Sequence, residues 1–492
     1  MDTLIIEKRN EVYITVDCDP NIQRELSEFF TFYVPGYKFM PAFRNRMWDG
    51  KIRLYSQKTK EIYFGLYPYI RAFAEERGYE IVTGKEVDIN NKVNKDVVTK
   101  FSNSLGQKFE ARDYQIDAIY HSLKFNRALL LSPTASGKSF IIYSLIRYYS
   151  HLIKDNPNNR VLLIVPTTSL VEQMYSDFQS YGWNVKKNCH RLYSGYSNQT
   201  DKKVLISTWQ SLYKLPKKYF EQFGCVFGDE AHLFKSKSLT EIMTKLVDCK
   251  YRIGLTGTLD GAQTHKLVLE GLFGAVNKVT STRKLMDKKQ LSNLVVRCLI
   301  LKHTEENCKM ISKGKYQDEI DYLVSSKSRN NFIKNLALKI KGNTLILFQL
   351  VEKHGKGLYE IIRDKSKQGR EVFFVYGGVD AEQREKVREI TEKSNNAIIV
   401  ASYGTFSTGI NIRNLHNIIF ASPSKSRIRN LQSIGRGLRL GDNKVNATLY
   451  DIADDLQYKS KENFTLKHFQ ERINIYTEEE FDYEIHNINL KE

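Results

Sequence analysis

Short apolar runs alternate with helix-length stretches along most of the chain. Runs rich in branched residues and separated in this way are typical of parallel sheets with crossover helices. They form two groups, one between residues 127 and 260 and one after residue 340. The pattern predicts two successive α/β domains of similar layout, with the stretch between the groups as linker and entry into the second. The predicted strands are ALLLS, VLLIVP, KVLIST, CVFGDE and YRIGLTG, then TLILFQ, EVFFVYG, AIIVAS, NIIFAS and ATLYDI.

The two ends of the chain follow other patterns. In the first hundred residues, strand-like segments (EVYITVD, KIRLYS, EIYFGLY) surround helical ones (NIQRELSEFFTF, YPYIRAFAEERG), which predicts a small α+β domain. Residues 85–107 are rich in Asn, Lys and Asp and are the predicted linker. The charged C-terminal end is predicted to be helical and to pack on the second α/β domain. The predicted domains are 1–103, 104–280, 281–455 and 456–492.

Composition narrows the class of protein. A chain of 492 residues is too long for one hydrophobic core, and 41% hydrophobic with 27% charged residues is typical of globular proteins. The six cysteines are scattered without a C-x-x-C pair, so neither a zinc site nor a disulfide framework is indicated. The N-terminus lacks the apolar run of a signal peptide, and the other apolar runs are of strand length. A cytoplasmic protein that uses no membrane is expected.

The charge balance is strongly basic. Seventy-five Lys and Arg against 56 Asp and Glu give a formal charge of +19 and a pI near 9.3. Such a field attracts polyanions, and nucleic acid is the natural partner, although a generally basic, soluble surface would have the same composition. Motifs have to decide between the two.

A phosphate-binding loop follows the first predicted strand. Gly137, Lys138 and Ser139 stand at the start of a predicted helix, where backbone N–H groups and the helix dipole favour an anion. Lys138 can reach the β- and γ-phosphates, and the Ser139 hydroxyl can ligate magnesium. The strict pattern begins with glycine where this chain has Ser132. The short match therefore needs support from other motifs.

An acidic pair ends the strand CVFGDE, which two other predicted strands separate from the phosphate-binding loop. Asp229 can hold magnesium through water, and Glu230 can orient and deprotonate the attacking water. Alone, such a pair is usually a solvated turn or a helix cap. Its position after the loop favours the catalytic interpretation.

Two arginines in the second domain complete the candidate ATPase. The segment Gln432–Arg439 reads QSIGRGLR and is predicted to be helical, so that Arg436 and Arg439 lie on one helix face. Arginine stabilises the charge that spreads over the γ-phosphate during transfer. Supplied by the second domain, these arginines would make hydrolysis depend on closure of a cleft. The alternative for an isolated segment is a basic, solvated helix.

These motifs carry a family resemblance. In this order and spacing, GKS, DEAH, LTGTL and QSIGRGLR resemble motifs I, II, III and VI of superfamily 2 helicases. The stretches LIVPTTSLVEQM, ASYGTFSTGINIRNLH and RMWDGKIRLY are similar to those of the recombination helicases of T-even-type bacteriophages, over most of the chain. The resemblance implies two tandem RecA-like domains, a small N-terminal α+β DNA-binding domain, ATP and Mg²⁺ as cofactors, and action on branched DNA. Fork regression, Holliday-junction migration and R-loop removal would be its tasks, in the host cytoplasm.

The resemblance also implies roles for single residues. ARDYQ resembles the adenine-contacting element, so Arg112 and Gln115 would hold the base, and Thr134 and Gly409 would join the nucleotide site. LTGTL implies that Thr256 and Thr258, with His232, couple hydrolysis to strand movement, and Gln432 would join the catalytic set. PTTSL, STWQS and SYGTFSTGINI resemble motifs Ia, Ib and V. The implied DNA-contacting residues are Pro166, Thr167, Thr168, Thr208, Gln210, Ser211, Ser407 and Thr408.

A basic and aromatic stretch lies between residues 38 and 60. Its cations, among them Arg44, Arg46, Lys51 and Arg53, are expected to pair with phosphates. Its rings, Phe39, Phe43, Trp48 and Tyr55, either stack on unpaired bases or form the core of the small domain, and the sequence leaves both interpretations open.

The leading hypothesis is a monomeric, ATP-dependent DNA helicase that acts on branched, forked or R-loop DNA, with single-strand-binding or recombination proteins as partners. An RNA helicase or a double-strand translocase that does not separate strands would share the motor motifs. A nucleotide-gated DNA clamp without turnover is disfavoured, because Glu230, Arg436 and Arg439 are all present.

Overall fold

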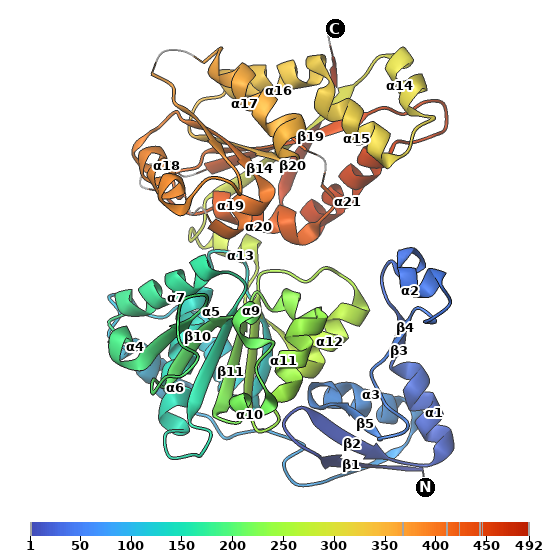
Figure 1. The fold of residues 1–492 in the computed structure, drawn as a ribbon, viewed down its shortest axis with the longest axis vertical. Coiled ribbons are helices and arrows are strands. Elements are labelled where there is room, and N and C mark those ends of the chain that lie inside the picture. Colours follow the sequence, from blue (N-terminus) through green and yellow to red (C-terminus); the bar gives the residue numbers. More distant parts are fainter. Residues whose placement is uncertain are drawn as a thin grey trace. The chain divides into compact units, whose positions relative to one another are not determined.

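The computed structural model describes residues 2–366, 369–409, 412–422, 424–441, 444 and 446–490. The chain packs as two units, one formed by residues 1–132 and 137–279 and the other by residues 133–136 and 280–492. The first unit holds the small N-terminal domain and one seven-stranded parallel sheet, and the second unit holds another (Figure 1). The predicted fold class, two tandem RecA-like domains with a small N-terminal α+β domain, is confirmed.

A four-stranded sheet and two helices form the N-terminal domain. The strand order is β5-β2-β1-β6, with β1 antiparallel to β2 and parallel to β6. Alternation along β1 buries Leu4 and Ile6, and these pack with Leu26 and Phe73 from the two helices in one core. The elements are β1 (Thr3–Lys8), β2 (Tyr13–Asp17), α1 (Pro20–Phe29), β5 (Glu61–Tyr63), α3 (Tyr67–Arg77) and β6 (Glu80–Thr83).

A separate hairpin leaves this domain after α1. Strands β3 (Thr31–Tyr33) and β4 (Lys51–Arg53) pair antiparallel, and the chain between them forms the 3-10 helix η1 (Tyr37–Phe39) and the short helix α2 (Pro41–Arg44). We call residues 34–50 the hairpin tip. Figure 1 shows α2 at the far end of the hairpin, away from the four-stranded sheet.

The N-terminal domain is docked on the sheet domain of its unit. Arg127, at the start of β7 (Arg127–Leu131), donates through Nη2 to the Glu11 carbonyl at 2.6 Å and to its carboxylate at 2.7 Å, and both side chains are buried. Tyr69 donates to the Glu270 carboxylate at 2.6 Å. A Cβ on Gly65 would overlap the Glu270 carbonyl oxygen, so the backbones meet where only glycine fits.

The sheet of the first unit has the order β13-β7-β12-β11-β8-β10-β9, and its registered pairs are all parallel. The five predicted strands are confirmed as β7, β8 (Arg160–Val165), β10 (Val204–Thr208), β11 (Phe223–Asp229) and β12 (Tyr251–Thr256). They were predictable because residues on both faces are buried, which requires continuous apolar runs. The sequence analysis missed the short edge strands β9 (Cys189–Leu192) and β13 (Val276–Lys278).

The sheet of the second unit has the order β16-β17-β15-β18-β19-β14-β20, again with parallel pairs. The five predicted strands are confirmed as β15 (Thr344–Phe348), β16 (Val372–Val375), β17 (Ile398–Ser402), β18 (Asn417–Phe420) and β19 (Asn446–Asp455). Their crossover helices include α16 (Lys327–Lys339), α17 (Lys356–Arg363) and α18 (Ala381–Lys393).

Three segments differ from the sequence-based expectation. The stretch expected to link the two domains contains the ten-residue strand β14 (Asn293–Lys302), in which buried and exposed residues mostly alternate. The predicted linker at residues 85–107 contains α4 (Lys95–Asn103), capped by the Asn94 side chain and packed through Val98 near α5 (Asp113–Phe125). The C-terminal end is helical in α21 (Phe464–Glu478), as expected, but then adds the exposed edge strand β20 (Asp482–Asn489).

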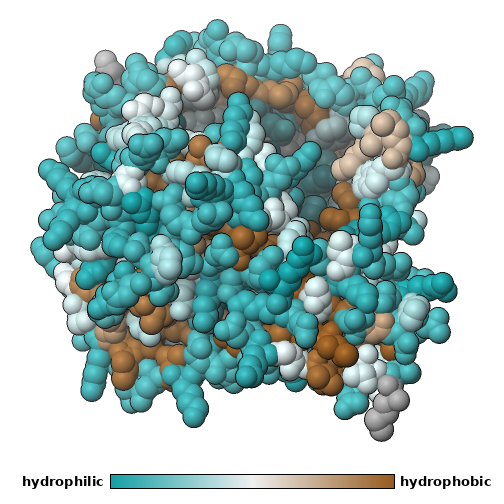
Figure 2. All heavy atoms as spheres, turned by 60° about the horizontal axis from the view of Figure 1, so that its bottom comes forward, coloured by the Kyte–Doolittle hydropathy of each residue, from teal (hydrophilic) through white to brown (hydrophobic). Residues whose placement is uncertain are grey.

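The visible surface is mainly hydrophilic. Figure 2 shows hydrophilic side chains over most of one face, with separate, small hydrophobic areas between them. In the part of the chain that the structure describes, no helix is long and apolar enough to cross a membrane.

Candidate nucleotide and nucleic-acid sites

The predicted phosphate-binding loop joins β7 to α6 (Lys138–Leu152). Gly137 caps α6 with a φ of 83°, a left-handed conformation that glycine adopts without strain, and so starts the helix at Lys138. The Ser132 N–H donates to the Thr256 carbonyl at 2.8 Å, which ties the start of the loop to the end of β12. The middle of the loop, residues 133–136 with Thr134, is grouped with the second unit.

Lys138 and Ser139 stand in the first turn of α6. The Lys138 ammonium is 3.5 Å from the Ser132 carbonyl, so it lies back across the loop that it would serve. Ser139 Oγ lies 2.9 Å from the hydroxyl of Tyr181, a residue that the sequence analysis missed. Burial raises the pKa of Tyr181 to about 12, which keeps the phenol neutral and able to donate.

The acidic pair lies at the carboxyl end of β11. Asp229 is 3% exposed, and its Oδ1 is buried without a hydrogen-bond partner among the described residues. Burial, with help from the neighbouring Glu230, raises the Asp229 pKa to about 7, against the opposing charge of Lys138. Glu230 has a φ of 50°, so the strand ends at Asp229 and the chain turns at Glu230 into a 3-10 helix.

A chain of polar contacts continues from the acidic pair through His232 and Thr256. His232 Nδ1 lies 2.9 Å from Thr256 Oγ1 and 3.4 Å from the Glu230 carboxylate. Thr256 donates to the Thr258 carbonyl at 3.0 Å. Burial lowers the pKa of His232, which favours the neutral ring. Strands β11 and β12 are neighbours, so parallel pairing brings these predicted coupling residues to one sheet edge.

A magnesium ion fits this edge. Magnesium keeps several waters and is usually held by one or two protein oxygens together with substrate phosphates. The unpartnered Asp229 oxygen and the Ser139 hydroxyl are suitable protein oxygens. Within the described ranges, no group of three or more His, Cys, Asp or Glu side chains could hold a metal. The site would therefore be completed by the nucleotide.

The predicted adenine element is the start of α5 (Asp113–Phe125). The Gln115 side-chain oxygen accepts from the Arg112 N–H at 3.0 Å, and Arg112 donates to the Tyr114 hydroxyl at 2.8 Å. A Cβ on Gly137 would overlap Gln115 Nε2. Gln115 thus lies against the phosphate-binding loop with its oxygen already engaged.

The predicted DNA-contacting motifs of the first unit lie at the same carboxyl edge. Strands β8 and β10 pair so that Thr208 stands opposite Val165, which places Pro166, Thr167 and Thr168 next to Thr208, Gln210 and Ser211. Thr167 caps α7 (Thr168–Ser180), accepting from the Leu170 N–H at 3.4 Å. Thr208 Oγ1 lies 3.2 Å from Ser211 Oγ, and Gln210 is exposed.

In the second unit, the predicted helix is α20 (Arg427–Gly437). Gln432 and Arg436 lie on it, and the Arg436 guanidinium is 5.8 Å from the ring of Phe406 in α19 (Tyr403–Gly409). The prediction that Arg436 and Arg439 share a helix face is wrong, because Leu438 caps the helix and Arg439 follows it. Ser407, Thr408 and Gly409 end α19, and the side chains of Ser407 and Thr408 lie outside the described part.

A buried lysine that the sequence analysis missed holds the chain where the arginines stand. Lys444 is 3% exposed, and its ammonium donates to the carbonyls of Gly437 and, at 2.9 Å, of Arg439. No sequence signal marks it, because a lysine in a polar loop is usually solvated.

The aromatic rings of residues 38–60 differ in whether they form core or are exposed and free to stack on bases. Tyr55 is core: it is 1% exposed and donates to the Val16 carbonyl at 3.1 Å. Trp48 is half-buried and donates to the Lys51 carbonyl at 2.8 Å, whereas Phe39 is 76% exposed. Met47, which the sequence analysis missed, is 80% exposed.

Most cations of this stretch lie on the hairpin tip and on strand β4. Arg44 and Arg46 are exposed, and they line an open hollow of about 600 Å³ with Lys38 and Trp48. Arg53 forms an exposed ion pair with Asp49 at 2.5 Å, and the Lys51 ammonium lies 5.0 Å from the Tyr33 ring. The hairpin therefore presents cations with aromatic rings beside them.

Known proteins resemble this chain over its whole length. Family models match in three places: "DNA helicase UvsW, N-terminal" at residues 6–84, "Type III restriction enzyme, res subunit" at 108–261 and "Helicase conserved C-terminal domain" at 328–441. The ATP-dependent DNA helicase uvsW of Enterobacteria phage T4 is 33% identical, over 97% of this chain and 98% of that protein. The crystal structure of T4 UvsW aligns with a TM-score of 0.53 at 32% identity and covers all of both chains. This chain therefore belongs to the UvsW family of ATP-dependent DNA helicases.

Proposed function

We propose that this helicase unwinds branched DNA (forks, four-way junctions and R-loops) and that its N-terminal hairpin selects the branch. The observation that carries the proposal is the pairing of a motor edge with an exposed basic hairpin in one unit. The motor edge holds Lys138, Asp229 and Thr256, while Arg44 and Arg46 stand on the hairpin tip. Hydrolysis and branch recognition would thus be separate tasks of one chain.

In the motor, Lys138 would neutralise the phosphates and Glu230 would take the proton of the attacking water. Ser139 and Asp229 would hold magnesium, which supplies positive charge to the phosphates when bound. The contact between His232 and Thr256, at 2.9 Å, supports a role of both in passing the state of the nucleotide to the DNA-contacting edge. Arg436 and Arg439 would stabilise charge that develops during transfer, so each matters for turnover more than for ATP affinity.

On DNA, Pro166 to Thr168 and Thr208 to Ser211 would follow the sugar-phosphate backbone, because they share the sheet edge next to the nucleotide loop. The hairpin cations would contact phosphates beside the branch. Protein partners of single-strand-binding or recombination type remain a further part of the proposal and come from the family resemblance.

A strand-displacement assay on matched forks, four-way junctions, R-loops, linear duplexes and RNA duplexes tests the proposal. We expect unwinding of the branched DNAs, and loss of turnover with retained DNA affinity for Lys138→Ala. Equal action on RNA duplexes would identify an RNA helicase instead. Stimulated ATPase without displaced strands would identify a double-strand translocase.

A further inference from the structure

The hairpin tip carries the two most exposed large hydrophobic side chains in the described part of the chain. Met47 is 80% exposed and Phe39 is 76% exposed, and Met40 between them in sequence is 38% exposed. Buried apolar area stabilises a fold, so side chains this exposed contribute little to folding. Their exposure needs another explanation.

The tip does not need these side chains, because it has a core of its own. The Tyr33 and Tyr37 rings stack at 4.6 Å, and Phe43 meets Tyr37 edge-on at 4.8 Å. Gly50 lies so close to the Tyr37 ring that a Cβ there would overlap it. Met47 is held by its backbone, whose N–H donates to the Ala42 carbonyl at 2.9 Å. The tip therefore has a packed core of rings, and the exposed Phe39 and Met47 side chains are not part of it.

The charges around the tip identify its partner. Lys38, Arg44 and Arg46 line the same hollow as Met47 and Trp48, and Asp49 is the single acid there, paired with Arg53. Exposed apolar side chains among cations match a ligand that offers apolar faces beside negative charges. Base pairs at an open DNA end or branch have both, since stacked bases lie between two phosphate backbones.

We propose that Phe39 and Met47 form a wedge that enters the base stack at the branch point and holds the separated strands apart. This inference rests on the proposed action on branched DNA and deepens it. Phe and Met are among the side chains that proteins insert between base steps. The cations fix the hairpin on the phosphates, and the wedge unstacks the bases between them. Binding and strand separation are therefore distinct functions of one hairpin.

The variant F39S/M47S tests the wedge, with V97S/M310S as its matched control. Val97 and Met310 are 62% and 56% exposed and lie on α4 and α14 (Glu305–Ile311), outside the hairpin. A forked duplex with 2-aminopurine at the branch pair reports unstacking by its fluorescence before ATP is added. Fork affinity, ATPase on single-stranded DNA and base pairs separated per ATP are measured on the same proteins.

We expect F39S/M47S to lose the fluorescence rise and to separate at least about tenfold fewer base pairs per ATP, because the wedge offsets part of the unstacking free energy. Fork affinity and ATPase should stay close to those of the unsubstituted protein and of V97S/M310S. F39L/M47L, which keeps apolar bulk, should restore both signals. The wedge is refuted if F39S/M47S unwinds normally, or if its fork affinity falls as far as its unwinding. If the unsubstituted protein unwinds no branched DNA, the proposed function fails instead.

Discussion

Asp229 shows how burial beside a second carboxylate can give a residue its chemistry. Its carboxyl is enclosed at the end of β11 beside Glu230, and its pKa is raised to about 7. The folded protein therefore holds a proton at pH values where the unfolded chain has released it. Between the unfolded pKa of 3.8 and the folded pKa of about 7, the contribution of Asp229 to the free energy of unfolding falls as pH rises, because this group binds fewer protons in the unfolded state.

We predict that Asp229→Asn stabilises the nucleotide-free protein while abolishing turnover. The amide cannot ionise, so the gain in unfolding free energy should be larger at pH 8 than at pH 6, by about 1 kcal/mol. Thermal unfolding at both pH values, without magnesium or nucleotide, measures this. A D229N variant that is no more stable than the parent at pH 8 would show that the carboxylate is not penalised by burial.

Lys444 is expected to position Arg439. Its ammonium donates to the carbonyls of Gly437, the last residue of α20, and of Arg439. Burial lowers the pKa of Lys444 to about 7. Lys444→Met leaves those carbonyls without their donor, at a cost of about 1–3 kcal/mol. We predict a lower kcat with little change in the KM for ATP. Lys339→Met, an exposed lysine of the same unit, is the control, and equal kcat values for the two variants would refute the role.

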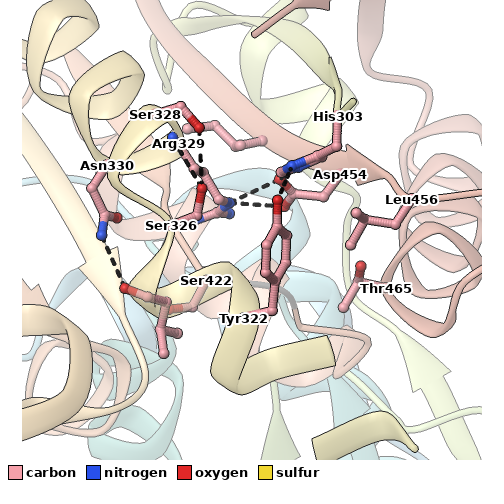
Figure 3. A network of polar contacts seen from close by, with 12 residues as sticks. His303, Tyr322, Ser326, Ser328, Arg329, Asn330, Ser422, Asp454, Leu456 and Thr465 are labelled. Atoms are coloured by element: carbon pink, nitrogen blue, oxygen red, sulfur yellow. Dashed lines mark hydrogen bonds and ion pairs between the residues drawn. The ribbon is translucent and has the colours of Figure 1, made fainter. Parts of the chain in front are cut away.

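At the scale of elements, α21 is fastened by buried polar contacts at its start and in its middle. Glu319 from α15 (Tyr316–Ser325) accepts from the Thr465 N–H at 2.7 Å, and α15 itself is tied through Tyr322 and His303 to Asp454 (Figure 3). Figure 3 also shows Arg329 directed at Asp454, which it contacts at 2.9 Å. In the middle of α21, Arg472 donates to Asp451 at 2.8 Å and to the carbonyl of Ser424, which precedes α20, at 3.0 Å.

Breaking the Arg472–Asp451 pair should unfold the second unit more easily. Arg472→Met leaves the fully buried Asp451 without its cation, which typically costs about 3–5 kcal/mol. The double variant with Asp451→Asn should recover part of that loss. Urea unfolding of the full chain measures both, with Lys353→Met, from an exposed pair with Asp321, as a control expected to cost about 0–1 kcal/mol. A cost for Arg472→Met no greater than that control would contradict the prediction.

Burial also explains which elements the sequence could predict. The central strands were predictable because burial on both faces demands uninterrupted apolar runs such as TLILF in β15. Strand β20 has the mostly exposed sequence DYEIHNIN and becomes a strand through its pairing with β14, a contact between distant residues. The motifs identify Lys138, Asp229 and His232 as candidates. No local pattern encodes the contact of Tyr181 with the distant Ser139, or the burial of Lys444 in a polar segment.

On the scale of the whole molecule, the formal charge of +19 makes the affinity for DNA depend on salt. Neutralising Arg44, Arg46, Lys51 and Arg53 together should weaken binding to branched DNA. The slope of the logarithm of the binding constant against the logarithm of the salt concentration should become shallower by about 0.7 to 0.9 for each lost phosphate contact. ATPase at saturating single-stranded DNA should survive.

The matched control neutralises four exposed lysines of the second unit, Lys309, Lys313, Lys327 and Lys339. It removes the same charge from the molecule without touching the hairpin. Binding titrations of a four-way junction across a salt series compare the three proteins. Identical slopes for both fourfold variants would mean that net charge, and not the hairpin, determines the affinity.

The buried ion pair of Arg127 and Glu11 affects how the two domains can evolve. Arg127 opens the strand that leads into the phosphate-binding loop, while Glu11 belongs to the N-terminal domain. A gene rearrangement that transplanted the motor without that domain would also inherit a guanidinium deprived of its carboxylate. The arginine at this position therefore has its partners, Glu11 and the Phe64 ring, only while the two modules stay together. An apolar residue at this position in a free-standing relative would mark a motor that has completed the separation.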